Sequence, residues 1–127
     1  MSREWLFSTL LDNPDLGVEV GDRIYQSSSI SEIPAVKPYI LYRFGTSAPA
    51  LVGDDGVTKR VQPIQLFVHD NPGDYARIDR ILVLIRATLE GQQSAEVTRC
   101  QWLEESEDLR DDEMFTITRF ARYQLIH

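Results

Sequence analysis

One stretch, from Val61 to Gly91, most constrains the fold, because it encodes a strand, a turn and a long helix in succession. It reads VQPIQLFVHDNPGDYARIDRILVLIRATLEG. In its first part, Ile64, Leu66 and Val68 occupy every second position, and a period of two is typical of a strand with one buried face. The stretch therefore predicts a strand that leads directly into a helix.

The residues after this strand predict a helix that begins at Asn71 and Pro72. Asn is a good N-cap, and Pro suits the first helical position because its missing N–H would have no partner there. Gly91 is the expected C-terminal stop. A helix of about 16 residues spans roughly 24 Å, enough to cover several strands. The apolar side chains that recur every three or four positions are Tyr75, Ile78, Leu82, Ile85 and Leu89.

Periodic patterns elsewhere predict one more helix and further strands. A short helix is expected at Ser2–Leu11, ended by Asn13-Pro14-Asp15. Extended segments are expected at 22–25, 39–44, 95–103 and 114–126, and a charged connection at 104–113. The chain is thus predicted to be a single α+β domain over residues 1–127, of order α-β-β-α-β-β. Its one antiparallel sheet of about four strands would carry the long helix and the short N-terminal helix on one face.

A long segment without periodicity, 45–60, reads GTSAPALVGDDGVTKR. Loops of about 16 residues are uncommon in compact domains and are usually functional or disordered. We expect a surface arm that joins two antiparallel strands, with a turn at Gly53-Asp54-Asp55-Gly56. Apolar side chains are unusual on a purely solvated loop, so the arm is expected to contact a partner. The candidate contact residues are Leu51, Val52, Asp54, Asp55, Val57, Lys59 and Arg60.

Charge and composition exclude several classes of protein. The formal net charge of −7 argues against a surface that grips nucleic acid, which needs clustered Lys and Arg. Solubility alone explains an acidic surface, and repulsion of passing DNA is an alternative. A single cysteine, Cys100, excludes an internal disulfide framework and indicates a reducing compartment. No apolar run is long enough to span a membrane, and the N-terminus lacks the pattern of a secretory signal.

Few residues are candidates for chemistry. His69-Asp70 superficially matches a metal-binding pair, but a strand-end histidine near a helix cap is the simpler interpretation. Cys100 has no base placed near it by the pattern, so a buried structural thiol is expected. The acidic run 104–113 lacks the spacing of a calcium loop and is expected to be a solvated connection. We therefore predict no catalytic, cofactor-binding or metal-binding residue.

Three parts of the chain resemble the tail terminator (tail completion) proteins of long-tailed bacteriophages. They are VQPIQLFVHDNPGDYARIDRILVLIRATLEG, TRCQWLEESEDLRDDE and MFTITRFARYQLIH. A short N-terminal helix followed by an extended segment such as 39–44 also belongs to the family pattern. The resemblance implies a structural protein and no enzyme: a homo-hexameric ring that caps the completed tail tube, stops its polymerisation and offers a surface to the head.

The resemblance also implies the partners and the location. The partners would be the tail tube protein and the head–tail connector protein, with no cofactor and no membrane. DNA would pass through the ring without sequence-specific binding. The protein would be made in the host cytoplasm and reside at the head-proximal end of the virion tail. Two alternatives remain open at this stage: a head-completion or connector ring protein, and a small α+β ligand-binding module or enzyme.

Overall fold

A computed structural model describes residues 2–26, 36–53, 56–91, 99–111 and 116–126. Within these residues, three helices and seven strands follow one another in irregular order. In order they are α1 (Ser2–Leu11), α2 (Pro14–Val20), β1 (Ile24–Gln26), β2 (Tyr39–Phe44), β3 (Ala48–Gly53), β4 (Gly56–Asp70), α3 (Tyr75–Leu89), β5 (Arg99–Glu105), β6 (Leu109–Asp111) and β7 (Thr116–Ile126).

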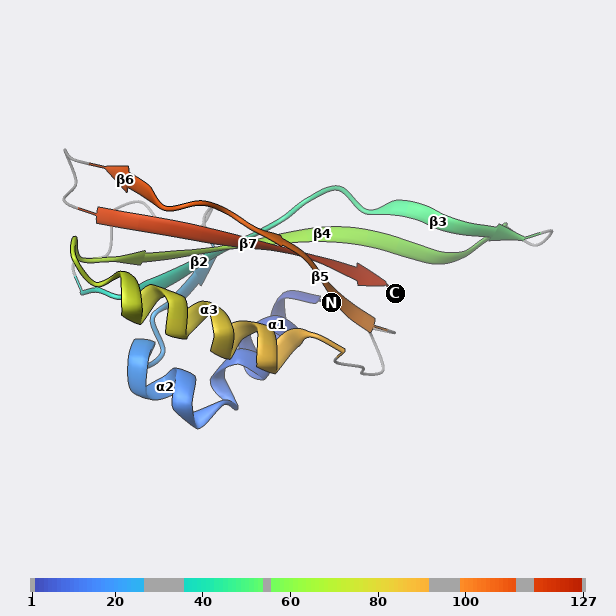
Figure 1. The fold of residues 1–127 in the computed structure, drawn as a ribbon. Coiled ribbons are helices and arrows are strands. Elements are labelled where there is room, and N and C mark those ends of the chain that lie inside the picture. The colour runs from blue at the N-terminus through green and yellow to red at the C-terminus, as the bar shows by residue number, and fades with distance from the viewer. Residues whose placement is uncertain (1, 27–35, 54–55, 92–98, 112–115, 127) are drawn as a thin grey trace.

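The strands form one sheet, and all three helices lie against the same face of it (Figure 1). The strand order is β1-β2-β4-β7-β5, with β3 paired to β4 and β6 paired to β7. The α+β class and the helices on one face are confirmed. The sheet has more strands than the four expected, and it is mixed, because the edge strand β1 runs parallel to β2 while the other pairs are antiparallel.

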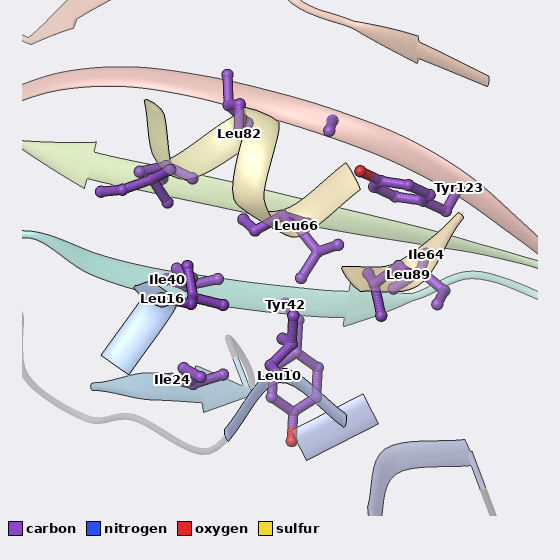
Figure 2. Close-up of a cluster of buried hydrophobic side chains, with 14 of the residues drawn as sticks. Leu10, Leu16, Ile24, Ile40, Tyr42, Ile64, Leu66, Leu82, Leu89 and Tyr123 are labelled. Atoms are coloured by element: carbon purple, nitrogen blue, oxygen red, sulfur yellow. The ribbon is translucent and has the colours of Figure 1, made fainter. Parts of the chain in front are cut away.

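The core lies between the sheet and the helices. Every second residue of β4, Ile64, Leu66 and Val68, is fully buried against the helical layer, as the period of two predicts. The apolar side of α3 meets them, with Leu82 and Leu89 at most 1% exposed. Figure 2 shows side chains from α1, α2 and the strands converging on the same space. Each such fully buried aliphatic side chain contributes roughly 1.5–3 kcal/mol.

The start of α3 differs from the prediction. The helix begins at Tyr75, with Asp74 in the N-cap position, and not at Asn71 and Pro72. Gly73 explains the difference, because its φ of +95° lies in the left-handed region and no α-helix can pass through it. The predicted C-terminal stop is confirmed: Gly91 has a φ of +81°, immediately after the last helical turn.

A second helix, α2, occupies residues that we expected to follow a helix-ending turn. Asn13 is its N-cap, and the Asn13 Oδ1 atom accepts hydrogen bonds from the backbone N–H groups of Asp15 (3.0 Å) and Leu16 (3.2 Å). Pro14 takes the first helical position. The same three residues therefore end α1 and start α2, and Leu16 and Val20 enter the core.

The segment 45–60 is a β-hairpin, so the prediction of an irregular loop is wrong. Strand β3 pairs antiparallel with the first part of β4, from Ala48↔Val61 to Gly53↔Gly56. Two irregularities in register, between residues 49 and 52, break the alternation that would have identified a strand in the sequence. The expectation that the segment joins two antiparallel strands, β2 and β4, is confirmed. Figure 1 shows this hairpin extending beyond the rest of the molecule.

The C-terminal part agrees with the predicted antiparallel pair of strands, β5 and β7. The charged connection is shorter than expected, because β5 continues to Glu105 and the short strand β6 pairs with β7. The predicted beginnings of these two strands, at 95–98 and at 114–115, lie outside the described residues.

Candidate assembly surface

The sheet has a second face that none of the described helices covers (Figure 1). We call it the open face and define it by the side chains that alternate with the buried ones on the four longest paired strands. Register places these side chains in rows across β2, β4, β7 and β5. Its described residues include Leu41, Arg43, Gln65, Phe67, His69, Arg99, Gln101, Glu104, Thr118, Phe120, Arg122 and Gln124.

An apolar row crosses the middle of the open face. Leu41, Phe67 and Phe120 are neighbours on three adjacent strands. The rings of Phe67 and Phe120 lie with their centroids 5.5 Å apart at 49°, a favourable tilted geometry. All three side chains are only partly buried. The open face thus presents apolar surface to whatever lies against it.

A polar row lies directly beside the apolar one. The Arg43 Nη2 atom donates to Gln65 Oε1 at 2.5 Å, and the Arg122 Nη1 atom donates to Glu104 Oε1 at 2.6 Å. The two arginines line a cavity of about 240 Å³ together with Gly45, Pro63 and Gln65. Within the described ranges, Arg43 has no carboxylate partner and the buried Nε of Arg122 has no hydrogen-bond acceptor. The row therefore holds two arginines and one carboxylate, and that carboxylate, Glu104, pairs with Arg122.

Gly45 shapes one wall of this cavity, where the chain leaves β2 for the hairpin. Its N–H donates to the Pro63 carbonyl at 2.8 Å, and its own carbonyl accepts from Gln62 Nε2 at 3.0 Å. A Cβ atom at position 45 would lie 2.4 Å from Pro63 Cγ, which no side chain tolerates without movement. Glycine therefore lets the chain pass close to Pro63 and keeps the cavity open between β2 and β7.

The far end of the open face holds His69. Its ring stacks on Tyr39 with centroids 4.9 Å apart, and its Nδ1 atom lies 3.0 Å from Thr118 Oγ1. Burial, with a smaller effect of the Lys37 charge, lowers the pKa of His69 to about 4. His69 is thus a neutral, packed residue at the end of β4, as predicted. In the described parts of the chain, no group of three or more His, Cys, Asp and Glu is placed to hold a metal ion.

Cys100 lies on the opposite, helix-covered face and is fully buried. Burial, with a smaller effect of the Glu90 charge, raises the pKa of its thiol to about 12. The prediction of a buried structural thiol is confirmed, because a thiol in this state does not supply a thiolate near neutral pH.

The acidic run after β5 is more tightly paired than a solvated connection. Arg119 projects from β7 toward it, and the Arg119 guanidinium lies 3.5 Å from Glu105, 3.7 Å from Asp108 and 2.5 Å from Asp79 on α3. Its Nε also donates to the Ser106 carbonyl at 3.1 Å. Arg119 therefore joins α3 to the end of β5 and to the segment between β5 and β6. The side chain of Asp111, and residues 112–113, lie outside the described part.

A second charged surface lies on the helical layer, around α2. Asp12 precedes the N-cap of α2, Asp15 lies in its first turn and Asp22 follows its C-terminal end; all three are exposed and have no cation partner among the described residues. The same stretch holds two exposed apolar side chains, Val18 on α2 (82% exposed) and Leu11 at the end of α1 (40% exposed). We call these five residues the acidic helical patch. It lies on the side of the molecule opposite the open face, because α2 is on the outside of the helical layer (Figure 1).

The predicted contact residues of the arm all fall in or beside the hairpin. Leu51 pairs with Lys59, and Val52 pairs with Val57, in the β3–β4 ladder. The side chains of these four residues, and the whole of Asp54 and Asp55, lie outside the described structure. Arg60, opposite Pro49, is exposed. Their role in partner contact stays a prediction. Neither surface was predicted. The open face is assembled from strands far apart in sequence, and the acidic helical patch lies in one stretch, residues 11–22, where a helix-ending turn was expected and the helix α2 was not.

In sequence, no protein-family model and no curated protein matches the chain. None of the described helices combines the length and the apolar character needed to cross a membrane. In structure, the chain is similar to a chain of the solved "Virion of native gene transfer agent (GTA) particle", with a TM-score of 0.75 and 13% identity. The match covers 95% of this chain and 90% of that one. The protein therefore shares its whole fold with a component of that virion.

Proposed function

We propose that this protein is a structural component of a phage virion, and that it forms a ring which caps the completed tail tube. The observation that carries the proposal is the fold shared with a virion chain over 95% of this chain. Because the match covers 95% of this chain and 90% of the virion chain, neither has a large structural element that the other lacks. The assignment to the tail, and to the head-proximal end of it, rests on the sequence resemblance to tail terminator proteins.

The surface of the domain supports a role in assembly. The hairpin of β3 and β4 extends from the body (Figure 1), and among the described residues β1, β3, β5 and β6 each pair with one strand only. Unpaired strand edges are ready templates for pairing with another chain. A head-to-tail ring also needs two different faces on each subunit. The open face and the acidic helical patch differ in both shape and charge, as such a ring requires.

In this proposal the protein performs no chemistry. The ring would stop addition of tube subunits, offer its other side to the head–tail connector protein, and let DNA pass through its channel. A hexamer is the expected stoichiometry, from the resemblance alone. The negative net charge would suit a channel through which DNA slides without sticking.

The test is an assembly reaction with the tail tube protein of the same phage. Purified protein is added during tube polymerisation, and tube lengths are measured by electron microscopy. We expect elongation to stop, with a ring of density at one end of each tube. Tubes that grow to the same lengths with and without the protein, and that carry no terminal density, would contradict the proposal. Bovine serum albumin at equal mass is the control for non-specific crowding.

A further inference from the structure

We propose that the open face binds the acidic helical patch of a second copy of this chain, in a head-to-tail contact. This inference deepens the proposed ring by naming the two surfaces that meet in it. Three features of the described residues support the contact: the charge of each surface, the cavity between the two arginines, and the exposed apolar side chains.

The two surfaces carry opposite charge. On the open face, the described charged residues of the four paired strands are three arginines, at 43, 99 and 122, against one glutamate, Glu104. On the acidic helical patch, Asp12, Asp15 and Asp22 stand without a described cation partner. Opposite potentials steer two surfaces together and disfavour the wrong pairing of like charges. A contact between two copies of the same patch would place acid against acid.

The cavity between Arg43 and Arg122 gives a carboxylate a place to bind. It measures about 240 Å³, which accommodates an aspartate side chain and neighbouring water. The guanidinium of Arg43 is exposed and bound only to the neutral Gln65 among its described partners, and Arg122, on the other side of the cavity, pairs with Glu104 through Nη1. A carboxylate between two guanidinium groups makes charge-assisted hydrogen bonds, which are stronger than neutral ones. Partial exclusion of water by the cavity walls strengthens them further.

Apolar side chains accompany the charges on both sides. Val18 is 82% exposed on α2, in the same stretch of chain as the three aspartates. On the open face, Leu41, Phe67 and Phe120 form the apolar row directly beside the two arginines. An apolar centre with a charged rim is the usual anatomy of a protein–protein interface. In the proposed contact, Val18 of one copy packs against the apolar row of the other copy while the aspartates pair with the arginines.

The positions of the two surfaces decide the symmetry. They lie on opposite sides of a two-layer molecule (Figure 1), so one copy can use both at once with two different neighbours. Such heterologous contacts propagate from copy to copy and close into a ring if the rotation per subunit allows it. A head-to-tail contact of this kind can therefore build a ring, whereas a two-fold contact would stop at a dimer.

The experiment uses charge reversal and mixing. One variant carries Asp12→Lys and Asp22→Lys, which makes the patch basic; the other carries Arg43→Glu, which makes the open face less basic. Each variant alone places like charges in contact, and we expect its midpoint concentration of assembly to rise at least about tenfold. Mixed at equal amounts, the two variants can alternate, because the basic patch of one meets the altered open face of the other. Assembly should then recover in the mixture, as measured by light scattering.

A matched control and a folding check accompany the variants. Glu107→Lys reverses one acidic charge at an exposed residue outside both surfaces and should leave assembly unchanged. Circular dichroism and thermal melting of each variant identify loss of folding. Asp15 is left in place, because it lies in the first turn of α2 and favours that helix end.

The outcomes separate this inference from the proposed ring. Rings that form equally well with all variants overturn the inference and leave the ring intact. Open filaments that the variants disrupt and the mixture restores support the inference and contradict the ring. A wild-type chain that stays monomeric at every concentration overturns the contact, and the tube-elongation assay then decides the function independently. Association with tube protein or DNA that depends on Arg43, without self-association, also overturns it.

Discussion

The carboxylate of Asp70 is fully buried and receives two hydrogen bonds from the guanidinium of Arg77, at 2.6 and 2.5 Å. Its Oδ1 atom also accepts the backbone N–H of Asn71 at 2.7 Å. Arg77 further reaches Asp74, at 3.2 Å. These contacts join the last residue of β4 to the first turn of α3 across the turn between them. The pair therefore holds the helix at a defined angle to the sheet.

Removing Arg77 should destabilise the fold strongly. Arg77→Met would leave the Asp70 carboxylate buried without its cation, and breaking a buried ion pair typically costs about 3–5 kcal/mol. The hydrogen bond and the charge of Asp70 raise the pKa of Arg77, which agrees with a favourable pairing. Urea unfolding measures the loss. The double variant with Asp70→Asn should recover part of it, and a single variant within about 0.5 kcal/mol of wild type would refute the assignment.

Truncating the core side of α3 should cost far more than truncating its exposed side. Leu82 is 1% exposed, and Leu82→Ala should lower the free energy of unfolding by about 2–5 kcal/mol through lost burial and the cavity left behind. The adjacent Val83 is 66% exposed, so Val83→Ala should stay within about 0.5 kcal/mol of wild type. Chemical denaturation compares the two. Equal losses would mean that α3 packs on another face.

His69 should make stability depend on pH. Its pKa of about 4 in the folded protein lies below the ordinary 6.5, so the unfolded chain binds the proton more readily. Stability is then lost as the pH falls from about 6.5 toward about 4, with a slope of at most about 1.4 kcal/mol per pH unit. We expect His69→Gln to lose this dependence, by on the order of 1 kcal/mol between pH 7 and pH 5. If the free energy of unfolding changed by the same amount between pH 7 and pH 5 in the variant and in wild type, this prediction would be wrong.

Shortening the hairpin should impair assembly and leave the domain folded. Because Pro49 pairs with Arg60, replacing residues 50–59 by Asn-Gly closes the ladder with a two-residue turn. The described core draws on side chains up to Phe44 and from Ile64 onward, so the free energy of unfolding should change by less than about 1 kcal/mol. Analytical ultracentrifugation then compares self-association with wild type. An unfolded product would show that the hairpin is part of the folding unit and not an arm.

Strong periodic patterns carried most of the fold prediction. The strand of Ile64, Leu66 and Val68 and the helix that follows it each have side chains that repeat with a single period, and the antiparallel pair β5–β7 keeps a period of two over most of its length. The predicted helix boundaries were wrong where the backbone conformation of a single residue overrides the sequence signal for a helix start. Asn13-Pro14 and Asn71-Pro72 look alike in sequence, yet only the first begins a helix, because Gly73 adopts a left-handed conformation after the second.

The candidate surfaces were beyond the reach of sequence patterns. The polar row combines Arg43, Gln65, Arg122 and Glu104, which come from four strands and meet only through the register of the sheet. Similarly, Arg119 interrupts an apolar pattern, and its partners on α3 and after β5 are set by packing. One signal was present in the sequence: four acidic residues lie between positions 12 and 22, beside a short apolar run.

Strand β4 has a mechanical consequence. Its 15 residues run without interruption from the tip of the hairpin to the turn before α3, and β2 and β7 flank its second half. A pull on the hairpin along the strand axis would therefore load those flanking hydrogen bonds in shear, all at once, and not peel them apart one by one. A force on the hairpin would thus be carried by β4 to the strands on both sides of it, at the centre of the sheet.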